Sequence, residues 1–407
     1  LSPGVWSCRG PRSNKKSYEF KVYPSGITKV TPDDGLYVHT YYDVCPFSPS
    51  QRYLAATKLP HQDHNALFGE TADVCIIDLQ EHTIETIYTT KSWGFQTGAH
   101  LHWGASDRYL YTNDVIGDSA VCVRIDRESG ESTAFAGPMY HIAPDESCVI
   151  SFPLELLDIT QLGYGVPSRD PKNPRRLPPG AAKDEGLWRT DLRTNEKKLL
   201  VSLADLAERI PEPPPRKDGT FYLWHSRFNP QGTRIHQVLR CIFPDGHGTT
   251  NATVFTFNPD GSDIRFLPSD PVWGLAGGHP NWHLDGEHII RNLSVDKRLR
   301  FCQWRYDGSD FKVLSDKFLG GGHPRIEPHG RYIVTDRYAH DGQRQTVTIR
   351  LIDLVSETEE EVCTMPTIDR DAVSDFVLRL DAHPNWSRDC RQVIFQAAPE
   401  GSRQLFV

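Results

Sequence analysis

Hydrophobic and polar positions alternate in short runs along most of the chain, and each run ends at a turn. Runs such as 53–56 and 332–334 follow turns directly, and the longer aliphatic run 74–79 comes next along the chain. Strand-length runs bounded by Gly, Pro and Asp are typical of an all-β protein. We therefore expect many short strands, with one short helix at Leu203–Ala207.

One turn pattern, related to x-Pro-Asp-Gly, occurs seven times. Pro fixes φ at the first turn position, and Gly or Asp tolerates the conformation that follows. The seven turns lie at 48–50, 104–107, 143–145, 229–232, 283–286, 327–330 and 387–389. Each unit has room for about four strands, so the repeat predicts a seven-bladed β-propeller that forms a single domain over residues 1–407. A pair of separate β-sandwiches is the alternative.

The ends of the chain predict how the ring closes. The last unit stops at Val407 after a third strand, whereas residues 26–30 form a strand with no partner in their own unit. This N-terminal strand is expected to complete the last blade and to cover sheet edges that an open ring would expose.

Two stretches interrupt the repeat. Residues 158–185 are rich in Pro, Gly and Arg, and residues 203–219 contain four prolines. Insertions of this length often lie over a functional face, so we expect both at one mouth of the propeller channel. For the second insertion, a surface connector is an equally good interpretation.

Composition narrows the function classes. The net charge of -8 gives no indication of a nucleic-acid or membrane-surface binder, and no apolar run is long enough for a transmembrane helix. The chain starts at Leu1 without a methionine, from which we expect a secreted or periplasmic protein. Nine cysteines without a CxxC pair leave at least one as a free thiol or a metal ligand, and their spacing does not decide between these roles.

Histidines recur at one position of the repeat. Five residues before the second position of each turn stand Val44, His100, Met139, His225, His279, His323 and His383. Three residues before it stand Pro46, His102, His141, Arg227, Asn281, Arg325 and Asn385. Because strand side chains alternate with period two, both layers are expected to face one channel, which would be a polar site of cationic character. Some of these histidines could instead serve a repeated structural hydrogen bond.

A zinc site is one interpretation of these residues. Imidazole and thiolate are typical zinc ligands, and we predict that Cys241 approaches His225, His279 and His323 from neighbouring blades. A structural zinc fits better than a catalytic one because the cysteine leaves little room for an open coordination position. The alternative is a buried free thiol beside unliganded histidines.

Several stretches together resemble the seven-bladed propeller polysaccharide lyases, in particular the ulvan lyases, with rhamnose-glucuronate and oligogalacturonate lyases as relatives. The resemblance spans nearly the whole chain, although the seventh turn and residues 239–241 depart from the pattern. It rests on residues 93–103, 111–114, 140–145, 163–165, 278–280 and 322–324.

This resemblance implies β-elimination at a glycosidic bond to a uronic acid, such as the glucuronate or iduronate of an ulvan-like sulfated glycan, giving an unsaturated uronate end. The reaction needs a base for the C5 proton, an acid for the leaving oxygen and a clamp for the carboxylate. We assign His100 as the base and Tyr164 as the acid. Substrate binding is assigned to Arg240, Arg227, Asn113, His141 and His102.

Other functions remain open at this point. A propeller can be a non-enzymatic binding scaffold, although such a scaffold does not need an axis lined by His and Arg. A peptidase cap is disfavoured because the chain has no GxSxG motif, and glycoside hydrolysis would need paired carboxylates where only Asp43 and Glu327 are near. We expect a monomer that binds an anionic polysaccharide or oligosaccharide, without nucleic acid, membrane or organic cofactor.

Overall fold

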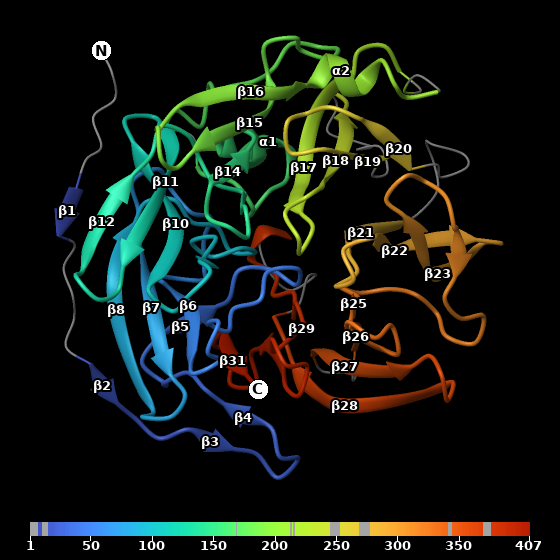
Figure 1. The fold of residues 1–407 in the computed structure, drawn as a ribbon. Helices are drawn as coiled ribbons and strands as arrows, with labels where there is room; N and C mark the ends of the chain where they lie inside the picture. Colours follow the sequence, from blue (N-terminus) through green and yellow to red (C-terminus); the bar gives the residue numbers. More distant parts are fainter. Residues whose placement is uncertain are drawn as a thin grey trace.

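Seven sheets surround a common axis in the computed structural model (Figure 1). The structure describes residues 7–9, 15–167, 169–211, 214, 216–244, 253–267, 277–340, 344–368 and 376–407. The predicted all-β, seven-bladed propeller is confirmed.

Each blade is an antiparallel sheet whose strands follow one another along the chain. Blade 1 contains β5 (Leu36–Val38), β6 (Tyr53–Leu59), β7 (Ala72–Asp78) and β8 (Thr83–Thr90). Blade 2 contains β9 (His102–Trp103), β10 (Tyr109–Ile116), β11 (Ser119–Asp126) and β12 (Glu131–Ala134). Blade 3 contains β13 (His141–Ile142), β14 (Cys148–Ser151), β15 (Gly186–Asp191) and β16 (Lys197–Ser202). Blade 4 contains β17 (Thr220–Phe228), β18 (Ile235–Ile242), β19 (Thr253–Phe257) and β20 (Arg265–Leu267).

The remaining blades repeat this arrangement. Blade 5 contains β21 (Gly277–Trp282), β22 (His288–Val295), β23 (Arg298–Arg305) and β24 (Lys312–Val313). Blade 6 contains β25 (Arg325–Ile326), β26 (Tyr332–His340), β27 (Gln345–Asp353) and β28 (Thr358–Pro366). Blade 7 contains β29 (Asn385–Trp386), β30 (Val393–Ala397) and β31 (Gln404–Phe406), and the 3-10 helix η2 (Phe376–Leu378) precedes it.

The N-terminal segment closes the ring and covers outer edges. Strand β4 (Thr28–Lys29) pairs with β31 of blade 7, as predicted for this region, and β3 (Lys21–Val22) adds a further strand outside it. Strand β2 (Lys16–Ser17) pairs with β8, and β1 (Ser7–Arg9) pairs with β12, so the segment runs along the outside of three blades (Figure 1). These pairings satisfy backbone groups that would otherwise form exposed strand edges.

The seven turns join the first strand of each blade to the second, so they all lie on one face of the ring, here called the turn face. The opposite face, where the first strands begin, is called the strand-start face. In six of the turns the fourth residue has a positive φ: Gln51, Glu146, Gly232, Gly286, Gly330 and Cys390. A type I turn that ends in a left-handed residue is a common hairpin connection, which explains why Pro, Asp and Gly recur there.

A tryptophan near three of these turns ties neighbouring blades together. The indole N–H groups of Trp103, Trp282 and Trp386 donate to the carbonyls of Pro46, Arg227 and Arg325, each on the preceding blade. The repeated blade-to-blade hydrogen bond near the turns therefore belongs to tryptophan.

The two insertions pack differently. The first follows η1 (Leu154–Leu156), begins within α1 (Leu157–Thr160) and brings residues 163–165 against Gly94 and Gln96 near the channel. The second begins with α2 (Leu203–Ala207), whose Leu203 and Leu206 are buried in the core beside β16 and β17. Its described part packs on the propeller wall, as a surface connector does. No described helix is long and apolar enough to cross a membrane.

Candidate functional site

Four of the five register histidines share an unusual backbone conformation. His100, His225, His279 and His383 all have φ between 47° and 56°. In blades 4 and 5 the pairing register shifts between Trp224 and Arg227 and between Gly278 and Asn281, which marks a bulge at the histidine. Left-handed non-glycine residues and bulges concentrate at functional sites, where they redirect side chains. His225 and His279 therefore each occupy a bulge.

Two tyrosines fill the middle of the channel. The first strand of blade 1 is interrupted between β5 and the bridge of Phe47 to Leu54, and the residues between them enter the channel. Tyr41 and Tyr42 are 1% and 0% exposed. The Tyr41 ring lies 4.5 Å from His383 and 5.4 Å from His225, and the Tyr42 ring lies 5.3 Å from His323. The two polar layers consequently face different mouths, which corrects the expectation of one shared channel.

Three imidazoles gather on the strand-start side of these tyrosines. The His323 ring is 4.3 Å from the His279 ring and 4.6 Å from the His383 ring. His279 is partly exposed, and no hydrogen bond to a described residue holds either of its ring nitrogens. Burial and the neighbouring histidines His323 and His225 place the pKa of His279 well below its usual value. The lowered pKa favours the neutral form of the His279 imidazole, whose side chain is partly exposed.

A carboxylate orients the central imidazole of this group. Asp336 lies 2.9 Å from Nδ1 of His323 and also accepts the His323 backbone N–H. Gly322 makes this approach possible, because it has a φ of 62° and a Cβ there would lie 2.0 Å from the Asp336 carbonyl oxygen. Although burial opposes it, the Asp336 charge raises the pKa of His323. Nε2 of His323 is left to face the channel.

His323, Asp381 and His383 form a group that could hold a metal ion, with ligand atoms all within 4.8 Å of one another. The group fits such an ion in two respects. Asp336 holds Nδ1 of His323, as carboxylates commonly hold the other ring nitrogen of metal-binding histidines. Nε2 of His383 is buried and has no hydrogen-bond partner in the described structure.

Among the described residues, no carboxylate pairs with Arg240, whose charge acts on His279, or with its neighbour Arg291. Arg240 is partly exposed and Arg291 is buried, and Nε of each lacks a hydrogen-bond partner among the described residues. Burial and the adjacent Arg240 charge lower the pKa of Arg291 to about 10. The Arg240 charge also acts on His279. Buried charges are normally paired, so this positive cluster is suited to an incoming anion.

Tyr164 reaches the same mouth from the first insertion. Its ring packs 4.6 Å from Trp224 and 5.7 Å from Tyr41, and its hydroxyl accepts a hydrogen bond of 3.1 Å from Arg379. Arg379 in turn pairs with Asp381 at 3.0 Å. The predicted acid thus lies on the same side of the channel as Arg240 and His279. Arg379 links its hydroxyl to Asp381, a member of the group that could hold a metal ion.

The second polar layer lines a separate cavity of about 460 Å³ on the turn face. Its walls include residues of the layer and of the neighbouring turns: Asp43, His102, His141, Arg227, Asn281, Trp282 and Arg325. Burial, His100 and other neighbouring charges keep the pKa of His102 well below its usual value. Of the predicted substrate-binding residues, His102, His141 and Arg227 therefore lie away from Tyr164 and Arg240.

Arg227 is held by a buried ion pair. Its Nε and Nη2 donate to the two carboxylate oxygens of Asp43 at 2.8 and 2.9 Å, and Nη1 donates to the Tyr140 carbonyl. Despite burial, the Arg227 charge and hydrogen bonds place the pKa of Asp43 well below its usual value. The guanidinium is thus already paired, and the prediction that Arg227 holds a substrate carboxylate is corrected to a structural role.

Replacing Asp43 with Asn should lower the free energy of unfolding by about 3–5 kcal/mol, because it leaves the buried Arg227 charge without a counter-charge. Urea unfolding followed by tryptophan fluorescence measures the effect. Asp118→Asn, which removes the exposed pair with Arg169, is the matched control and should change nothing measurable. Equal stabilities for the two variants would contradict the assigned role of Asp43.

His100 makes a structural contact. Its Nε2 lies 2.7 Å from the Tyr140 carbonyl oxygen on the next blade, and the side chain is buried. Burial and the nearby Arg227 charge lower the pKa of His100 to about 3. With one nitrogen engaged and little exposure, His100 is poorly placed to remove a substrate proton.

Two further predictions are corrected by the packing. Asn113 is fully buried, and its side-chain amide exchanges hydrogen bonds with the Met139 backbone at 2.7 and 2.8 Å, so no amide group is left for a substrate. Cys241 follows Arg240 on β18 and points to the other side of the sheet, over Gly219. The predicted zinc set of His225, Cys241, His279 and His323 therefore does not come together.

Sequence reasoning missed several residues of this site. Asp381 and Arg379 lie just before the seventh register position, and Asp336 and Arg291 lie on second strands of their blades. Extending the register by two and four residues before His383 would have found Asp381 and Arg379. No comparable signal marks Asp336, because strand pairing alone brings it to His323.

A scan against protein-family models finds no match, and a search of curated proteins finds none either. Solved structures do resemble the chain. An oligogalacturonate lyase in complex with manganese is 14% identical, with a TM-score of 0.66 over 97% of this chain and 96% of that chain. An oligogalacturonate lyase from Vibrio parahaemolyticus is also 14% identical, with a TM-score of 0.65 over 98% of both chains. At this identity the likeness concerns the fold, which is the propeller of these lyases over its full length.

Proposed function

We propose that this protein is a lyase that cleaves a uronate-containing oligosaccharide or polysaccharide by β-elimination at the strand-start mouth. The observation that carries the proposal is the pair of guanidinium groups of Arg240 and Arg291, which no described carboxylate neutralises, beside the partly exposed His279, whose pKa is lowered. The full-length fold likeness to two oligogalacturonate lyases supports the same class of reaction.

In this proposal, Arg240 and Arg291 bind the uronate carboxylate, which makes the C5 proton more acidic. His279 accepts that proton, the C4–O bond breaks as the C4=C5 double bond forms, and Tyr164 protonates the departing oxygen. Arg379 donates to the Tyr164 hydroxyl oxygen and so favours proton release from it. His279 replaces His100 as the base because Nε2 of His100 is engaged by the Tyr140 carbonyl.

The residues that would hold a divalent metal are His323, Asp381 and His383. A bound cation would supply positive charge that acidifies the C5 proton further. Imidazole and carboxylate ligands suit several divalent metals, and one of the similar lyases is described in complex with manganese. The sequence-based preference for zinc is therefore broadened to a divalent cation.

The Tyr164→Phe variant should reduce kcat about 100- to 10,000-fold with a smaller change in KM, because it removes the proposed acid but keeps the ring on Trp224. The rate of unsaturated-product formation measures the effect. Tyr88→Phe is a matched control, since Tyr88 lies on β8, the fourth strand of blade 1, and its hydroxyl donates to Asp114 of blade 2. If Tyr164→Phe retains the wild-type kcat, Tyr164 is not the acid.

Incubation with a substrate panel tests the function itself. The panel contains oligogalacturonate, ulvan and rhamnose-glucuronate glycans of gum arabic, and the absorbance of the unsaturated uronate is followed. We expect absorbance to rise with at least one uronate substrate, and the panel also tests the ulvan specificity that the sequence suggested. No rise with any of them, beside retained binding to one, would favour a binding scaffold.

A further inference from the structure

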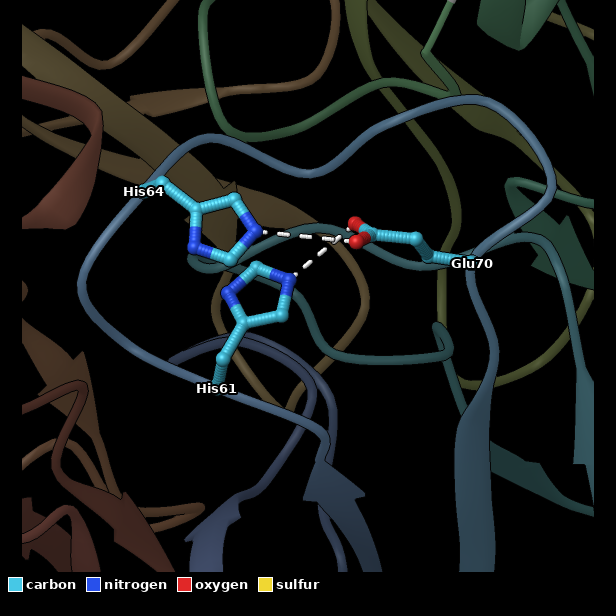
Figure 2. A group of neighbouring side chains, drawn as sticks. All are labelled: His61, His64 and Glu70. Atoms are coloured by element: carbon cyan, nitrogen blue, oxygen red, sulfur yellow. Dashed lines mark hydrogen bonds and ion pairs between the residues drawn. The ribbon is translucent and has the colours of Figure 1, made fainter.

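A second group of side chains that could bind a metal ion lies in the loop between β6 and β7, separate from the channel group of His323, Asp381 and His383. Figure 2 shows His61 and His64 side by side, with Glu70 facing both rings. Nε2 of His61 is 3.0 Å from Oε2 of Glu70, and Nε2 of His64 is 3.6 Å from Oε1. Both Nε2 atoms therefore face one carboxylate, and the ring centroids lie 3.6 Å apart with an interplanar angle of 14°. Because a metal ion lies in the plane of each imidazole that binds it, one ring turns out of this stack when both rings bind the same ion.

The outer contacts of this group hold its members in place. Asp63 lies 2.7 Å from Nδ1 of His64, and the Leu67 backbone N–H donates to Oε2 of Glu70 at 2.8 Å. Metal-binding histidines commonly donate their other N–H to a carboxylate, and metal-binding carboxylates are themselves hydrogen-bonded. Nδ1 of His64 lies within hydrogen-bond distance of Asp63, and in the tautomer that donates there the Nε2 lone pair and the Glu70 oxygens are acceptors that face each other. Such an arrangement requires a cation or a proton between them.

We propose that His61, His64 and Glu70 bind a divalent transition-metal ion of the zinc type. Metal–ligand distances of roughly 2.1 Å in a tetrahedral site separate the ligand atoms by roughly 3.4 Å. The distances of 3.0 and 3.6 Å lie on either side of that value. The side chains of His64 and Glu70 are 50% and 30% exposed, which leaves access for a water molecule as the fourth ligand.

The ion would stiffen one wall of the strand-start mouth. The Glu70 carbonyl accepts the Trp93 indole N–H at 3.1 Å, and the His61 ring lies 5.5 Å from Trp93. Trp93 packs in one apolar cluster with Val377 and Leu378, which immediately precede Arg379. The site therefore clamps the loop that supports these residues, and it does not depend on the function proposed for the channel.

Zinc stoichiometry tests the proposal. Full-length wild-type protein and the variants His64→Ala, Glu70→Gln and His329→Ala are stripped with a chelator, loaded with zinc, gel-filtered and analysed for metal. His329 is an exposed histidine outside both groups and serves as the control. We expect His64→Ala and Glu70→Gln each to retain one zinc ion fewer per chain than wild type and His329→Ala, whatever the channel group binds.

Visible absorption after loading with cobalt gives a second readout. Wild type should show the intense bands of four-coordinate cobalt, and Glu70→Gln should lose that contribution while His329→Ala keeps it. Because His64 is half exposed, its replacement should leave the melting temperature of the metal-free protein unchanged. Equal zinc content in all four proteins would overturn the proposal and leave a proton shared between His64 and Glu70.

Discussion

The Arg240→Ala variant should lower kcat/KM for the uronate substrate about 100- to 1,000-fold, the usual cost of removing one charge-stabilising donor from an active site. Of the two guanidinium groups that no described carboxylate neutralises, Arg240 is the partly exposed one, and its charge acts on both His279 and Arg291. Losing it should raise KM through weaker carboxylate binding and lower kcat through a less acidic C5 proton. Initial rates of unsaturated-product formation over a range of substrate concentrations measure both effects.

Two comparison variants make this result specific. Arg240→Lys keeps the charge but not the planar fork that matches a carboxylate, so it should recover only part of the activity. Arg305→Ala removes an arginine that pairs with Glu287 and Asp307 at the protein surface and should behave as wild type. A wild-type value of kcat/KM in Arg240→Ala would show that Arg240 does not bind the substrate carboxylate.

His279→Gln should reduce kcat about 100- to 10,000-fold, the range found when a general base is removed. Gln keeps a polar side chain of similar length but accepts no proton at neutral pH. Its melting temperature should stay close to that of wild type, because no described hydrogen bond depends on the His279 ring. Single-turnover rates with a saturating uronate oligosaccharide measure the chemical step.

His100→Gln is the matched comparison for His279→Gln. Because His100 bonds the Tyr140 carbonyl between blades 2 and 3, its replacement should lower the melting temperature and change the single-turnover rate less. The opposite pattern, with activity lost in His100→Gln and kept in His279→Gln, would restore His100 as the base.

The fold could be predicted from sequence because its signals are local. The turn residues determine each hairpin, as at Gly286 and Gly330, where the fourth turn position has a positive φ. Spacing from those turns then aligned His279, His323 and His383, which the structure brings together. A repeat converts local signals into long-range contacts, since equivalent positions of successive blades face the same axis.

The parts of the site that could not be predicted depend on non-local packing. The period-two argument placed both polar layers in one channel, but Tyr41 and Tyr42 occupy the space between them. Nothing in the alternation of blade 1 marks that excursion, because Val44 and Pro46 simply fill the register positions. Similarly, only the pairing of β26 within blade 6 brings Asp336 beside His323.

Whether a residue is available for a ligand also depends on its partners. The sequence gives no reason to distinguish Arg227 from Arg240 as a binding residue. In the structure, Asp43 neutralises Arg227, whereas no described carboxylate pairs with Arg240. Asn113 and His100 are likewise engaged by backbone groups of the next blade. The sequence therefore predicted which polar residues line the channel, whereas their hydrogen bonds in the structure determine which of these side chains are available to a ligand.

The masses of the products formed from oligogalacturonate, or from whichever panel substrate binds, test the central claim most directly. Elimination gives a new non-reducing end that is lighter than a hydrolysis product by one water and absorbs ultraviolet light. We predict this product with wild-type protein and its loss in Arg240→Ala. Saturated products that carry the added water, or unsaturated products formed equally by Arg240→Ala, would contradict β-elimination at the strand-start mouth.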